Sequence, residues 1–105
     1  MELTWDVKVL RTAAEQSLGV KQFLFPLPTN YLLFFPGVRP GTYVNMVNVK
    51  EPLHIYFLDA GLTVVGSGTL RLGEVAPVPP NAEHLVEISS QAQPPQEFGF
   101  LAQYI

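Results

Sequence analysis

Residues 53–65 read LHIYFLDAGLTVV, and they carry the clearest structural signal in the chain. Residues 53–58 are rich in side chains that favour β-strands, and residues 62–65 resume that character after the Asp-Ala-Gly at 59–61. A three-residue loop that ends in glycine is typical of a β-hairpin with a G1-type bulge. We therefore predict a hairpin here, with Gly61 in the left-handed conformation.

Asp59 opens this loop, where its carboxylate can accept hydrogen bonds from backbone N–H groups of the turn. This structural role is enough to explain why an aspartate stands at position 59, without a functional role. Gly66 and Gly68 interrupt the second arm of the hairpin, which resumes at residues 69–72, so a bulge or bend is expected there.

A single short helix is predicted before the hairpin. Thr12 and Glu15 have the spacing of a capping box, and Gly19 is a typical C-terminal stop. A helix of about two turns is unstable alone in water. We therefore expect Ala14 and Leu18 to pack against a sheet.

The rest of the chain favours short strands separated by proline and glycine. These strands are expected at residues 2–10, 31–35, 42–49, 84–89 and 98–105, the last as a closing edge strand. Many short strands with frequent turn signals and one small helix are typical of a β-sandwich or barrel. The chain is thus predicted to be mostly β and to form one domain over residues 1–105.

Composition narrows the classes of function. The chain has 105 residues and no cysteine, which excludes disulfides, cysteine-bound zinc and thiol catalysis. Six Lys and Arg residues against nine Asp and Glu residues are too few to form a basic surface, so we expect no nucleic-acid partner.

No apolar run has the ~18 residues of a membrane-spanning helix, and the acidic residues Glu2 and Asp6 do not suit a signal peptide. No membrane partner is expected, and the cytoplasm is the expected location.

The middle of the chain resembles a known family. Tyr43-Val44-Asn45-Met46-Val47-Asn48-Val49, followed by residues 52–59 (PLHIYFLD), is similar to the signature of domain-of-unknown-function family 192. Weaker similarity extends the resemblance over about residues 9 to 90. His54 departs from the family pattern, where an aspartate is usual. The resemblance implies a β-sandwich of jelly-roll type without an established activity.

The sequence contains no recognisable catalytic constellation. The serines lie outside any nucleophile-elbow context, so no catalytic residue is assigned. His54 and His84 are the only histidines, and a metal site could be built only by adding a carboxylate such as Glu87 or Asp59. Structural or surface roles explain these histidines better, and we expect neither a metal nor a cofactor. Glu83 and Glu87 share one strand face by their even spacing, and we expect that face to be solvated.

Two classes of function remain open. The leading hypothesis is a non-catalytic domain that acts by binding or by protein–protein interaction, with homodimerisation as its simplest form, because low charge favours an exposed apolar patch. The alternative is a small-molecule-binding or enzymatic jelly-roll. Its pocket would lie between the sheets and near Met46, Asn48, His54 and Asp59, although Asn48 has a structural interpretation as well. The many aromatic residues are expected mainly to fill the core.

Overall fold

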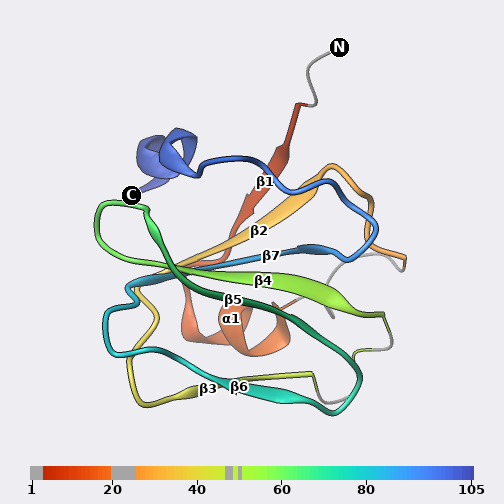
Figure 1. The fold of residues 1–105 in the computed structure, drawn as a ribbon, viewed down its shortest axis with the longest axis horizontal. Helices are drawn as coiled ribbons and strands as arrows, with labels where there is room; N and C mark the ends of the chain where they lie inside the picture. Colours follow the sequence, from red (N-terminus) through yellow and green to blue (C-terminus); the bar gives the residue numbers. More distant parts are fainter. Residues whose placement is uncertain (1–3, 20–25, 47–48, 50) are drawn as a thin grey trace.

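The computed structural model describes residues 4–19, 26–46, 49 and 51–105. Within these ranges the chain forms one open five-stranded sheet, a separate two-stranded ribbon and two short helices (Figure 1). The larger sheet contains β1 (Asp6–Val9), β2 (Tyr31–Pro36), β4 (Leu53–Leu58), β5 (Val64–Leu70) and β7 (His84–Ser89). The ribbon pairs β3 (Tyr43–Asn45) with β6 (Val75–Pro77), and the helices are α1 (Ala13–Leu18) and the 3₁₀ helix η2 (Gly99–Tyr104). The fold is therefore mostly β, as predicted.

The larger sheet has the strand order β1-β2-β7-β4-β5. Its pairs are antiparallel except for β1 and β2, which run parallel. Parallel neighbours need a crossover connection, and the segment that contains α1 supplies it. β1 and β5 lie at the two ends of this order, so the described strands do not close into a barrel. The barrel alternative is wrong.

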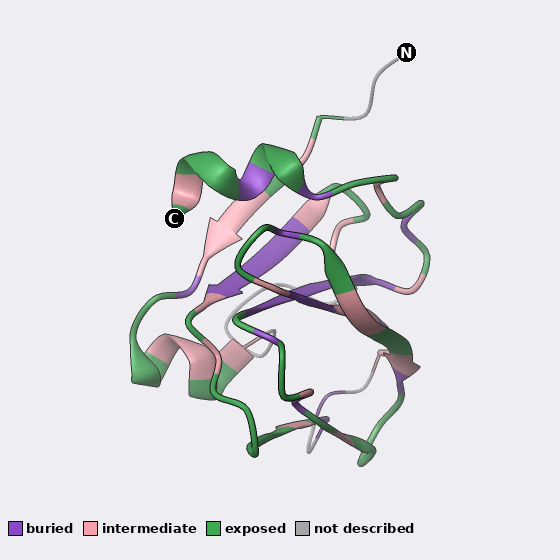
Figure 2. Ribbon diagram, turned by 60° about the vertical axis from the view of Figure 1, so that its left-hand side comes forward, coloured by how far each residue is buried: buried purple, intermediate pink, exposed green. Residues whose placement is uncertain are grey.

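Both faces of the larger sheet are covered, because alternate residues of its central strands pack into two separate clusters. On one face Leu33, Ile55 and Leu85 pack with residues of the β3–β6 ribbon and its loops. On the other face Leu32, Val86 and Ile88 pack with the C-terminal segment. The central strands are buried along almost their whole length (Figure 2).

The helix α1 begins as predicted but does not pack as predicted. Thr12 caps it, and its hydroxyl accepts from the Glu15 N–H while the Glu15 carboxylate accepts from the Thr12 N–H. Ala14 is exposed and Leu18 is 52% exposed. The helix is held instead by Gln16, whose amide donates to the carbonyls of Leu10 and Pro36 at 2.8 and 3.0 Å. Polar anchoring replaces the expected apolar contact.

The C-terminal segment was predicted as an edge strand and is a 3₁₀ helix. Leu101 of η2 is fully buried, together with Phe98 just before it, against the second face of the sheet. Because the residues are spaced three apart, both lie on one side of a helix with three residues per turn. The segment closes a face of the sheet instead of extending its edge.

The hairpin between β4 and β5 forms with one correction. Leu62, not Gly61, has the positive φ, at 66°. The Asp59 carboxylate accepts from the N–H groups of Gly61 and Thr63, each at 2.9 Å, which confirms its role in the turn. Leu62 takes the strained position because its side chain is buried in the second cluster. Residue 64 pairs with Leu58 while Gly66 pairs with Phe57, so the expected bulge is present.

The strand predicted at residues 42–49 is shorter in the structure. β3 ends at Asn45, and Met46 lies in the following loop, where its N–H donates to the carbonyl of Glu74. No helix of the described ranges is long and apolar enough to span a bilayer.

Candidate functional site

Glu87 is the buried carboxyl group among the residues that the structure describes. β7 lies between β2 and β4, and Glu87 stands opposite Leu33 on one neighbour and Ile55 on the other. Its side chain shares the face of Leu85, which belongs to the first core cluster, and only 6% of the residue is exposed. The expectation that Glu87 lies on a solvated face is therefore wrong, whereas Glu83 is exposed.

No hydrogen bond or ion pair to the Glu87 carboxyl is found within the described part of the chain, and because no fully buried side-chain oxygen there lacks a partner, its oxygens are reached through an opening at the surface. Burial, which disfavours the charged form, raises the pKa of Glu87 to about 7. At neutral pH the group is thus divided between its neutral and its ionised form. Buried carboxyls in proteins are normally paired or hydrogen-bonded, so this one calls for an explanation.

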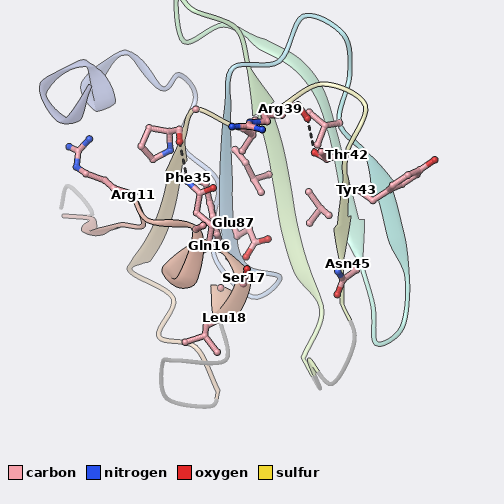
Figure 3. Close-up of a pocket in the computed structure, with 18 of the residues that line it drawn as sticks. Arg11, Gln16, Ser17, Leu18, Phe35, Arg39, Thr42, Tyr43, Asn45 and Glu87 are labelled. Carbon is pink, nitrogen blue, oxygen red and sulfur yellow. Dashed lines mark hydrogen bonds between the residues drawn. The ribbon is translucent and has the colours of Figure 1, made fainter.

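Glu87 opens into a cleft of about 660 Å³. Figure 3 shows the side chain between α1 and the strands, with Gln16 and Ser17 beside it. The walls come from α1, from the end of β2 with the turn that follows it, and from β3 with Met46 and Val49. The apolar part of the lining consists of Leu18, Phe35, Val38, Val44, Met46, Val49, Val78 and Leu85.

Two arginines lie at the cleft, and neither neutralises the carboxyl. The Arg11 guanidinium donates to the carbonyl of Tyr104, which holds it beside the C-terminus. Arg39 is exposed and follows β2 in the turn at the mouth of the cleft. Burial is the only cause that acts on the pKa of Glu87, so both positive charges are too distant to offset its ionisation.

Of the residues predicted to form a pocket, the structure places one in this cleft. Met46 is 1% exposed and lines it, whereas Asn48 lies outside the described residues. His54 is elsewhere, and its Nδ1 makes a 2.7 Å hydrogen bond with the hydroxyl of Thr69 on the neighbouring strand. Asp59 is engaged in the hairpin turn. The structure therefore does not bring Met46, His54 and Asp59 together in this cleft.

The two histidines are also apart. His54 pairs with Ile88 and His84 pairs with Leu58, so four residues, or about 13 Å of strand, separate their positions on the β4–β7 ladder. The described ranges hold no cluster of three or more His, Asp or Glu that could bind a metal ion. A metal site built on both histidines has no support in this geometry.

A second hollow, of about 760 Å³, lies near the β4–β5 turn and is lined by Asp59, Glu83 and His84, among others. Its two inner polar groups are engaged, because Asp59 accepts from the turn and the Nδ1 of His84 accepts from the Gly37 N–H at 3.3 Å. Burial lowers the pKa of His84, which keeps the ring neutral at pH 7. This hollow therefore lacks the unmatched polar group that marks the first one.

Sequence reasoning considered Glu87 only as a possible metal ligand and did not select it as a site residue, although a signal was present. Residues 84–89 read HLVEIS, so a lone carboxyl sits in an apolar strand with turn signals on both sides. Such a strand can be buried on both faces. Which neighbours flank it, and whether they offer a counter-charge, depends on the strand order.

The fold has relatives among solved structures. A crystal structure of a protein of unknown function from Novosphingobium aromaticivorans DSM 12444 is similar, with a TM-score of 0.70 and 23% identity over 83% of this chain. This chain spans 64% of the length of that protein. A “putative transcription regulator” from Sinorhizobium meliloti 1021 has a TM-score of 0.68 and 13% identity, over 79% of this chain and 67% of that one.

No protein-family model matches this chain. No curated protein matches it either. At these identities the two structures establish a shared fold and nothing about the site.

Proposed function

We propose that this domain binds a small organic molecule in the cleft between α1 and the β3–β6 ribbon, without transforming it. The observation that carries the proposal is the carboxyl of Glu87, which lines that cleft from a residue that is only 6% exposed and has no partner among the described residues. The volume lies within the roughly 300–1,000 Å³ range of ligand sites, and the lining is about half apolar and half polar.

Binding is favoured over catalysis by the composition of the described lining. General acid–base chemistry commonly uses a second positioned group, and nucleophilic chemistry needs a base beside the nucleophile. The Ser17 hydroxyl and the Gln16 amide are polar groups of α1 that line the cleft, and Gln16 already donates to two backbone carbonyls. A single carboxyl with no such partner suits recognition.

A fragment screen by ¹H–¹⁵N NMR tests this proposal. We expect some fragments to shift the amide signals of the lining residues. Ser17→Trp should block these shifts, because residue 17 is exposed on α1 at the cleft and can carry a large side chain without entering the core. Ser67→Trp, at an exposed position of β5, is the matched control. A screen in which no fragment shifts the amide signals of the cleft residues would refute the proposal.

A second candidate is association through the outer face of the β3–β6 ribbon. Tyr43 pairs with Pro77 and Asn45 pairs with Val75, so these four residues share one face, and all are exposed. Tyr43 and Val75 are 68% and 57% exposed, which matches the apolar patch expected for homodimerisation. Sedimentation of the wild type beside Tyr43→Ser tests it, and a strict monomer at high micromolar concentration would refute it.

Several finer expectations remain proposals. They are the jelly-roll arrangement, the membership of domain-of-unknown-function family 192 and the cytoplasmic location. Superposition on solved members of that family, with strands in the same order, would support the first two. Nucleic-acid binding is not proposed, because the net charge is −3, although the Sinorhizobium meliloti protein is described as a regulator.

A further inference from the structure

We propose that the ligand of this cleft is a small organic cation with an apolar body, whose ammonium or amidinium group pairs with the Glu87 carboxylate; this rests on the function proposed above. The strand position of Glu87 is the first argument. Its neighbours across the ladder are Leu33 and Ile55, which offer neither a donor nor a positive charge. The protein therefore buries an acid without supplying a counter-charge among its described residues.

Among the described residues, the other charged or titratable groups that line the cleft are Arg11 before α1, Arg39 after β2 and Tyr43 on β3. Arg11 is held by Tyr104, and Arg39 is exposed. The Tyr43 side chain is exposed and points away from Glu87 (Figure 3). The described residues of β4 and β7 contribute no other charge to this face. We infer that a ligand supplies a counter-charge that the described residues lack.

A cationic nitrogen fits this floor better than other groups. An ammonium or amidinium donates charge-assisted hydrogen bonds to a carboxylate, which are about twice as strong as neutral ones. In a cleft partly removed from water, the attraction between opposite charges is also screened less. An anionic ligand would be repelled by the ionised Glu87, and a neutral ligand would leave the charge uncompensated.

The body of the ligand is set by the walls. Phe35, Val44 and Leu85 come from three different strands and line the cleft together with Met46. Their side chains can cover an aromatic or aliphatic group of modest size, whose transfer from water adds to the affinity. The ligand is thus amphipathic, with its charge at the buried end.

Matched fragments test this inference by NMR titration at pH 8. The pairs are benzamidine with benzamide, benzylamine with benzyl alcohol, and phenethylamine with phenethyl alcohol. We expect at least one cation to shift the cleft residues and to bind at least tenfold tighter than its neutral partner. Glu87→Gln should abolish that difference. Glu83→Gln is the matched control, because it removes an exposed carboxylate four residues before Glu87. This variant should keep the difference in affinity between the cation and its neutral partner.

The pH dependence of cation binding provides a second readout. Because the cation pairs with ionised Glu87, its affinity should rise about tenfold per pH unit well below pH 7 and level off above it. Neutral fragments that bind the cleft as tightly as the cations would overturn the inference and leave the proposed function standing. If neither these pairs nor any fragment of the wider screen shifts the cleft residues, both fall.

Discussion

The carboxyl group of Glu87 links the stability of the fold to pH. Burial raises its pKa from 4.5 to about 7, so the folded chain holds this proton more tightly than the unfolded chain does. The stabilisation that this proton provides is fully present below pH 4.5 and is lost as the pH rises through about 7. In the ligand-free protein, ionised Glu87 is thus a cost to folding.

Urea unfolding of the wild type and of Glu87→Gln should reveal this cost. We expect similar stabilities near pH 4.5 and a gain of about 3 kcal/mol for Glu87→Gln at pH 8, because the amide has no charge to bury. The lowered pKa of His84 acts in both proteins and cancels in the difference. A difference that stays constant over this pH range would contradict the burial of an unpaired acid.

Backbone conformation at two glycines gives a second residue-scale prediction. Gly61 lacks a positive φ, and a Cβ there would meet the Asp59 carboxylate at an ordinary 3.5 Å. Gly61→Ala should leave stability unchanged or raise it by up to about 1 kcal/mol. Gly73 has open space around it but a φ of +80°, so Gly73→Ala should cost about 1 kcal/mol. Thermal melts of both variants check this contrast. A larger loss of stability for Gly61→Ala than for Gly73→Ala would indicate that Gly61 has the left-handed conformation after all.

At the scale of the element, α1 is placed by polar contacts. Its capping box satisfies the N-terminus, and Gln16 ties the helix to the backbone on both sides of it, at Leu10 and Pro36. None of its residues is buried. A helix of six residues is too short to be stable by its own helix propensity, so contacts with neighbouring segments of the chain hold it in place. Since α1 forms one wall of the cleft, Gln16 also positions the site.

Gln16→Ala should therefore destabilise the protein by about 1–3 kcal/mol, because two carbonyls lose their donor. Leu18→Ala should cost less than about 0.5 kcal/mol, since that side chain is half exposed. Denaturant melts of the two variants decide between polar and apolar anchoring. A larger loss for Leu18→Ala would favour the apolar packing expected from the sequence.

At the scale of the whole molecule, one sheet separates two apolar layers. The radius of gyration is 12.6 Å, close to the value of about 13 Å that a compact domain of this length should have. Residues of the β3–β6 ribbon and its loops pack against one face, while Phe98 and Leu101 of the C-terminal segment pack against the other. The C-terminal segment is thus part of the core.

Leu101→Ala tests that role of the C-terminus. We expect a loss of about 2–5 kcal/mol, because a fully buried side chain is removed from a packed layer. Phe100→Ala, at a neighbouring position that is 36% exposed, should cost much less. Equal and small effects in chemical denaturation would mean that η2 only rests on the surface.

Several local elements follow from the sequence alone, because short-range chemistry determines them. Alternating or apolar runs bounded by proline and glycine predicted β2, β4 and β7, and the Thr12 and Glu15 pair predicted the start of α1. The Asp59 turn followed from the same kind of local hydrogen bonding. Each depends on residues a few positions apart.

Tertiary structure decided the rest, because burial depends on partners far along the chain. Leu62 holds the left-handed position since its side chain joins a distant cluster, and the C-terminal segment is helical since Leu101 meets the sheet. Glu87 became a site residue only when β7 was placed between two apolar strands beneath a cleft. A strand pattern predicts which side chains share a face of the strand. Only the strand order determines which face is buried, and whether a charged side chain on that face has a partner.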